Sequence, residues 1–67
     1  MKISLKAART NAGFTQKEVA EQLDVTVETV RNWERGRSYP NAIRIQALEK
    51  LYGVPYDNLI FLHSNTL

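Results

Sequence analysis

Hydrophobic residues recur along this chain at helical spacing, and capping residues and glycines divide them into short segments. In the first segment Leu5 and Ala8 are three residues apart, and Ala12 follows one turn later. Ser4 precedes them and can cap a helix, while Gly13 supplies a left-handed stop. We therefore predict a first helix between Ser4 and Gly13.

A second helix is indicated by a capping box. Thr15 is followed three residues later by Glu18, so each side chain can bind the backbone N–H of the other residue. The positions that we expect to be buried are Val19, Ala20 and Leu23. This helix should end near Leu23.

The third helix follows after a very short connection. Only Asp24 and Val25 separate Leu23 from Thr26, the next capping residue, and Gly36 marks the end of a helix that runs to about residue 35. So short a link does not reverse the chain, so the two helices should cross at a steep angle. This spacing is typical of a helix-turn-helix.

The third helix has two different faces. At about 100° per residue, Val30 and Trp33 fall on one side, which we expect to face the core. The opposite side is mostly polar, and it carries Glu28, Arg31, Asn32 and Arg35 with Val27 at its edge. Such a face is typical of any solvated helix, but it also suits a major groove.

Two more helices complete the predicted fold. The fourth runs over residues 41–52, and its expected inward positions are Ile43, Ala47, Leu48 and Leu51. Pro55 can open a short fifth helix with Leu59 as its main core contact. We therefore predict an all-α, compact five-helix bundle. It forms one domain over residues 1–67, with a core at 4–60 and a short tail at 61–67.

Length and composition narrow the class of protein. A chain of 67 residues without cysteine must be held together by packing alone, which favours a helical bundle. The longest apolar run, residues 59–62, is far shorter than the roughly 20 residues of a membrane span. No apolar signal segment follows Met1, so we expect a cytoplasmic protein with no membrane partner.

The charge pattern permits a polyanionic partner. The net charge is +2, and Arg31, Arg35 and Arg37 fall within seven positions. On the outer face of the third helix, Arg31 could bind guanine, Asn32 adenine and Glu28 the amine of cytosine. Val27 could touch a thymine methyl group. A carboxylate near phosphates is repelled unless it finds such an amine or pairs with Arg31 or Arg35.

Gln16 is a further candidate for contact with DNA. It lies at the start of the second helix, where free N–H groups and the helix dipole favour a phosphate. An exposed polar residue in a first turn is the ordinary alternative. The position of Gln16 alone therefore does not distinguish a phosphate contact from an ordinary exposed residue, and the fold must be considered as well.

From Leu5 to about Leu59 the chain resembles the phage repressor and Cro-like helix-turn-helix family, which has the lambda-repressor-like fold. The resemblance is carried by Arg9, by GFTQKEVAEQLDVTVETVRNWERGRSYP at residues 13–40, and by the hydrophobic spacing of the fourth helix. One departure is Asp24, because the family often has glycine in this turn. Aspartate tolerates the left-handed region better than most residues, so the fold is not contradicted.

The resemblance implies a set of site residues. Base contacts are implied for Val27, Glu28, Arg31 and Asn32. Contacts with the DNA backbone are implied at the start of helix two and after helix three, and we expect them from Gln16, Lys17, Thr26, Arg35, Arg37 and Ser38. Arg9 and Glu34 match positions that often form an ion pair between helices one and three. Ala20 matches the small residue that lets helices two and three approach closely.

The expected function is that of a phage-like or prophage-like transcription regulator. We predict a small repressor that binds a pseudo-palindromic operator in double-stranded DNA as a homodimer, with half-sites about 34 Å apart. The alternative is an antitoxin or other protein-binding module that uses Tyr39, Tyr52, Tyr56 and residues 60–62 as an apolar surface. Tyr52 and Leu59 could equally complete the core.

An enzyme is the least favoured class. The sequence shows no arrangement of nucleophile and base, no metal-ligand spacing and no phosphate-binding glycine loop. The one histidine, His63, lies in the tail, where we expect it to be exposed. We predict no catalytic residue, no metal, no cofactor and no small-molecule effector.

Overall fold

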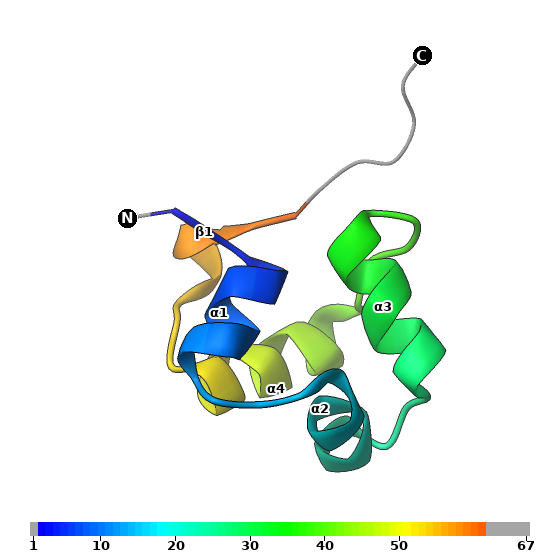
Figure 1. The fold of residues 1–67 in the computed structure, drawn as a ribbon. Coiled ribbons are helices and arrows are strands. Elements are labelled where there is room, and N and C mark those ends of the chain that lie inside the picture. Colours follow the sequence, from blue (N-terminus) through cyan, green and yellow to red (C-terminus); the bar gives the residue numbers. More distant parts are fainter. Residues whose placement is uncertain (1, 62–67) are drawn as a thin grey trace.

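The structure, a computed structural model, describes residues 2–61. Within this range four α-helices enclose one core, and a short pair of strands joins the two ends (Figure 1). The elements in chain order are β1 (Ile3–Ser4), α1 (Leu5–Asn11), α2 (Gln16–Leu23), α3 (Val27–Arg35), α4 (Ala42–Tyr52), the 3-10 helix η1 (Tyr56–Asn58) and β2 (Leu59–Ile60). The structure is therefore mostly helical, as predicted.

A polar side chain caps the start of each of the four α-helices. Each capping side chain accepts a hydrogen bond from the backbone N–H three residues later, and the capping residues are Ser4, Thr15, Thr26 and Asn41. Thr15 also donates its own N–H to the Glu18 carboxylate at 2.8 Å, which completes the capping box. The caps predicted at Ser4, Thr15 and Thr26 are thus confirmed, and so is the left-handed stop at Gly36.

The core contains two or more residues from each of the four α-helices. Its buried members are Leu5, Ala8, Val19, Ala20, Leu23, Val30, Trp33, Leu48, Tyr52 and Leu59. Tyr52 and Leu59 therefore complete the core, as the sequence also allowed, and neither is part of an exposed binding surface. Ala47 and Leu51 are partly buried and pack against it.

One expected inward position, that of Ile43, is wrong. Ile43 is 70% exposed. It precedes Leu48 by five residues, which places it about 140° around the helix from that buried side chain. Ala12 is also exposed, because α1 ends at Asn11 and Ala12 is its C-cap.

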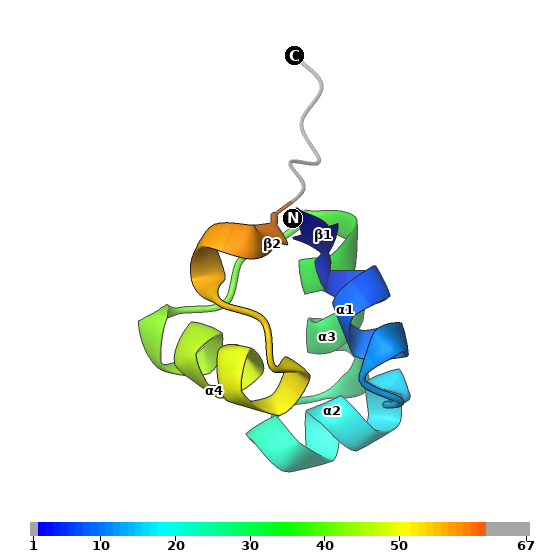
Figure 2. The ribbon, with the colours of Figure 1, turned by 90° about the vertical axis from the view of Figure 1, so that its left-hand side faces the viewer.

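The predicted fifth helix is not confirmed. After a single 3-10 turn the backbone becomes extended at Leu59 (φ −86°, ψ 134°), and β2 then pairs with β1 in parallel (Figure 2). Ile3 lies opposite Leu59, and Ser4 lies opposite Ile60. The backbone groups of β1 offer a hydrogen-bonding partner that a further helix would leave unused. The expectation of an all-α fold is corrected to this extent.

A sharp turn positions α3 against α2. Asp24 adopts a left-handed conformation (φ 59°, ψ 46°), and the N–H of Val25 donates to the carbonyl of Ala20 at 3.0 Å. The connection is as short as predicted. Ala20 itself is only 3% exposed, so a small side chain lies where the turn folds back on α2. The steep crossing leaves one side of α3 outside the bundle (Figure 1).

Among residues 2–61, every helix is too short or too polar to span a bilayer. The same residues contain no group of three or more potential metal ligands among histidine, cysteine, aspartate and glutamate. The tail residues Leu62 and His63 lie outside the described residues.

Candidate nucleic-acid interface

The outer face of α3 is accessible because its inner face is anchored. Val30 and Trp33 are 1% and 6% exposed and hold the helix against the core. On the outer face Glu28 is exposed, and Arg31 and Asn32 are half-buried. The two faces of this helix are therefore as predicted from the sequence.

An ion pair lies along the outer face of α3. Nη1 of Arg31 donates to Oε1 of Glu28 at 2.5 Å, and the two side chains are 37% and 61% exposed. Of the two arginines that the sequence offered as partners, Arg31 and Arg35, Glu28 therefore pairs with Arg31. The pair turns the Arg31 side chain toward the start of the helix, while its other N–H groups can still donate.

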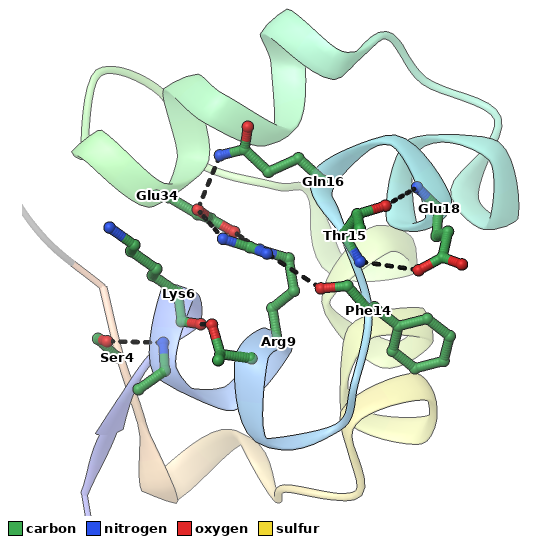
Figure 3. Close-up of polar contacts among 10 residues, drawn as sticks. Ser4, Lys6, Arg9, Phe14, Thr15, Gln16, Glu18 and Glu34 are labelled. Carbon is green, nitrogen blue, oxygen red and sulfur yellow. Dashed lines mark hydrogen bonds and ion pairs between the residues drawn. The ribbon is translucent and has the colours of Figure 1, made fainter.

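A second ion pair connects α1 to the end of α3 (Figure 3). Nε of Arg9 donates to Oε2 of Glu34 at 2.6 Å, and Nη2 donates to Oε1 at 3.3 Å. A third donor, Nη1, reaches the carbonyl of Phe14 at 3.0 Å. The hydrogen bond with Glu34 raises the pKa of Arg9. The resemblance implied this pair, and the structure contains it.

Gln16 is held by the same carboxylate. Its Nε2 donates to Oε1 of Glu34 at 3.0 Å, and this bond ties the first turn of α2 to the end of α3 (Figure 3). A primary amide has two N–H donors, so one remains for another acceptor. Nearby, burial raises the pKa of Tyr52, whose neutral hydroxyl adds no negative charge beside Glu34.

The other residues expected to contact a DNA backbone surround α3. Thr26 is exposed at the start of the helix, where its hydroxyl caps the N–H of Thr29 at 3.1 Å. Beyond the other end the chain turns back, because the N–H of Arg37 donates to the carbonyl of Asn32 at 2.9 Å. The remaining expected backbone contacts are exposed as well, at Lys17, Arg35 and Ser38.

A polar hollow of about 330 Å³ brings several of these residues together. Its lining residues come from α1, α2 and α3, and they are Lys6, Gln16, Arg31, Glu34 and Arg35. Sequence reasoning missed Lys6. It precedes Arg9 by three residues, so helical spacing places both on neighbouring parts of one face. The three-residue spacing from Arg9, together with the expected ion pair of Arg9 with the third helix, could have identified Lys6.

Comparison with known proteins agrees with this arrangement. A family model described as helix-turn-helix matches residues 5–59. This range includes α2, the left-handed turn at Asp24 and α3, together with the helices that support them. The chain belongs to the helix-turn-helix family.

Two curated helix-turn-helix relatives resemble this chain. It is 36% identical over 56 residues to the HTH-type transcriptional activator BcrR of Enterococcus faecalis, an alignment that covers 84% of this chain and 28% of BcrR. It is 41% identical over 56 residues to the HTH-type transcriptional regulator ImmR of Bacillus subtilis strain 168, with 84% of this chain and 44% of ImmR covered. The chain thus spans less than half the length of either relative.

Proposed function

We propose that this chain is a sequence-specific DNA-binding domain of a transcription regulator, and that residues 1–67 form one domain. One observation carries the proposal: Val30 and Trp33 anchor α3 from behind, so that its polar face is presented outward. The major groove of B-DNA admits one α-helix. Membership of the helix-turn-helix family and the names of the two relatives support this reading.

The base contacts follow from the chemistry of the outer face. Arg31 offers two parallel donors to guanine, and the amide of Asn32 matches adenine. Glu28 accepts from cytosine. Val27 is partly buried and packs against the core, and the exposed part of its side chain touches a thymine methyl group. Within residues 2–61 the Asn32 side chain forms no hydrogen bond, so binding a base costs it no internal partner.

Contacts with phosphates fix the domain on the duplex. Gln16 and Lys17 lie in the first turn of α2, and Thr26 lies at the start of α3. Past the end of α3, the exposed side chains of Arg35, Arg37 and Ser38 flank the groove-facing surface. Such contacts give affinity and register without reading the sequence.

We further propose that the protein acts as a homodimeric repressor. One domain of this size covers few base pairs, so a pseudo-palindromic operator with half-sites about 34 Å apart would supply the missing affinity. Repression requires only that the operator be occupied, and no small-molecule effector is needed. When the protein is supplied, expression of a reporter gene placed downstream of its operator should therefore decrease. A rise would show an activator instead.

Selection of bound duplexes from a random DNA pool tests DNA reading directly. We expect a consensus with two related half-sites, and affinity for it should fall steeply between 50 and 200 mM salt. Replacing Arg31 by alanine should cost roughly 1–3 kcal/mol and relax the preference at one base pair. Replacing Arg37 should weaken binding to all duplexes alike. Equal losses on every duplex for Arg31→Ala would show that Arg31 does not read a base.

A second candidate function is supported by an exposed apolar surface. Four large hydrophobic residues are 40% to 70% exposed, and they are Tyr39, Ile43, Tyr56 and Ile60. An antitoxin or another protein-binding module would use such a surface to bind its partner. Tyr52, which the sequence also offered for this role, is buried. The two functions separate in the selection experiment, because a purely protein-binding domain enriches no DNA sequence over random DNA.

A further inference from the structure

The polar hollow described above contains a cation that the proposed interface does not use. Lys6 projects from α1, and in Figure 3 its ammonium end extends toward the end of α3 that carries Glu34. The residue is exposed, and within residues 2–61 its ammonium has no ion-pair partner. A positive charge on a helix outside the recognition motif therefore faces the recognition helix itself.

The charge of the hollow favours an anion. Its lining carries three cations, Lys6, Arg31 and Arg35, and one carboxylate, Glu34. That carboxylate is 6% exposed and already receives two hydrogen bonds from Arg9 and one from Gln16. Glu34 is thus neutralised from behind, which leaves the field of the hollow positive.

The geometry of the donors suits a phosphate group. The amide of Gln16 is fixed by its bond to Glu34, and its second N–H is available at the edge of the same hollow. Arg35, like Lys6, has no ion-pair partner among residues 2–61. Two unpaired cations and one oriented amide donor therefore converge from three helices on a single space beside the outer face of α3.

We propose that Lys6 binds a phosphate of the DNA backbone in this hollow, so that α1 takes part in the interface together with α2 and α3. The inference rests on the proposed function, since it needs α3 in a major groove to bring a phosphate to this position. Gln16 and Arg35 contact the same phosphate. Arg9 is a positioning residue, because it holds Glu34 and through it the amide of Gln16.

The first test compares two lysine variants on two duplexes, the selected operator and a scrambled duplex of equal length. Each lost phosphate contact lowers the salt slope by about 0.9, so Lys6→Ala should bind both duplexes about eightfold more weakly per bound copy at 0.1 M salt. The difference in affinity between Lys6→Ala and wild type should disappear as the salt concentration approaches about 1 M. Lys50→Ala is the matched control, because Lys50 is an exposed lysine of α4 that lines a different hollow with Gln22 and Leu23. It should bind both duplexes like wild type.

A second measurement locates the contact on the DNA. Duplexes carrying a single neutral methylphosphonate at each backbone position in turn should show one position per half-site where wild type loses more affinity than Lys6→Ala, which keeps only the contacts of Gln16 and Arg35 with that phosphate. Circular dichroism checks that both variants keep the wild-type helical signal. Because Lys6 is exposed and outside the core, its replacement should leave folding intact.

The outcomes distinguish the two proposals. If wild type prefers the operator but Lys6→Ala binds like Lys50→Ala, Lys6 makes no phosphate contact and the proposed function stands. A loss confined to the operator duplex would assign Lys6 to base reading and overturn the inference as well. If wild type shows no preference for any duplex, the proposed function fails and the contact of Lys6 fails with it.

Discussion

Glu28 limits what the recognition face of α3 can bind. It lies 2.5 Å from Arg31 and is 61% exposed, so a carboxylate stands where DNA phosphates would approach. Unlike charges about 4 Å apart attract by about 1 kcal/mol even in water, and like charges repel by as much. A random duplex offers this carboxylate no fixed partner, whereas a cytosine at the right position supplies an amine. We therefore propose that Glu28 weakens non-specific binding to DNA.

This role of Glu28 predicts an unusual variant. Replacing it by glutamine removes the repulsion and frees Arg31, so binding to scrambled DNA should strengthen about fivefold, as expected for roughly 1 kcal/mol. Affinity for the operator should rise less or fall, because the acceptor for cytosine is weakened. The measurement is a pair of titrations by fluorescence anisotropy, one on each duplex.

A matched control for Glu28 lies on α2. Glu21 is exposed and forms no ion pair within residues 2–61, so Glu21→Gln changes the net charge equally outside the recognition face. It should leave the ratio of operator to scrambled affinity unchanged. If Glu28→Gln leaves that ratio unchanged too, Glu28 has no part in discrimination.

At the scale of elements, local signals predicted the helices well. A cap such as Thr15 and a stop such as Gly36 act on the adjoining backbone, so the sequence around them contains the whole cause. The buried stripes of α2 and α3 follow in the same way from helical periodicity. These signals also predicted which face of α3 carries Arg31.

The parts that were not predictable depend on residues distant in sequence. Ile3 pairs with Leu59 across the molecule, and no local pattern shows that the end of the chain will extend to meet the start. The bond between Gln16 and Glu34 likewise joins two helices, so the sequence suggested only that Gln16 faces a phosphate. For Ile43, the apolar residues of α4 lie on more than one side of the helix, and periodicity alone chose wrongly.

The turn between α2 and α3 offers a test of stability. Asp24 holds a left-handed conformation at φ 59°, which costs L-residues other than glycine roughly 1–2 kcal/mol and aspartate less. Asp24→Gly should therefore raise the free energy of unfolding by about 0.5 kcal/mol, because the relief of strain is partly offset by the greater freedom of glycine when unfolded. Urea denaturation followed by circular dichroism measures the change.

Asp24→Ala should change the stability in the opposite direction. Alanine has a Cβ and no polar group that could hydrogen-bond locally in the left-handed region, so it should lower the free energy of unfolding by about 1 kcal/mol. Operator affinity should change little in either variant, since the exposed face of α3 is untouched. A glycine variant less stable than wild type would show that the strain at Asp24 is smaller than the entropic cost of glycine in the unfolded chain.

At the scale of the whole molecule, one side is polar and another is apolar. The polar side is the outer face of α3 and the hollow beside it. The apolar side is a groove of about 350 Å³ lined by Tyr39, Pro40, Ile45, Tyr56 and Phe61, in which the rings of Tyr56 and Phe61 lie 5.7 Å apart. None of the residues that line this groove is one that we propose to contact DNA, so we propose that a second copy of the chain occupies it.

This assignment predicts a variant that separates dimerisation from DNA reading. Tyr56 is 51% exposed, and Tyr56→Lys would place a charge in the apolar interface. Loss of a central aromatic residue typically costs an interface about 2 kcal/mol or more, so the dimer should dissociate at a more than tenfold higher concentration. Binding to a full operator should weaken by a similar factor, while binding to a single half-site duplex should stay at the wild-type level. Sedimentation equilibrium and titrations on the two duplexes measure these effects.

Gln46→Lys adds the same charge at an exposed position of α4 and should dimerise normally. A Tyr56→Lys protein that still binds two half-sites as wild type does would place the dimer interface elsewhere on the molecule.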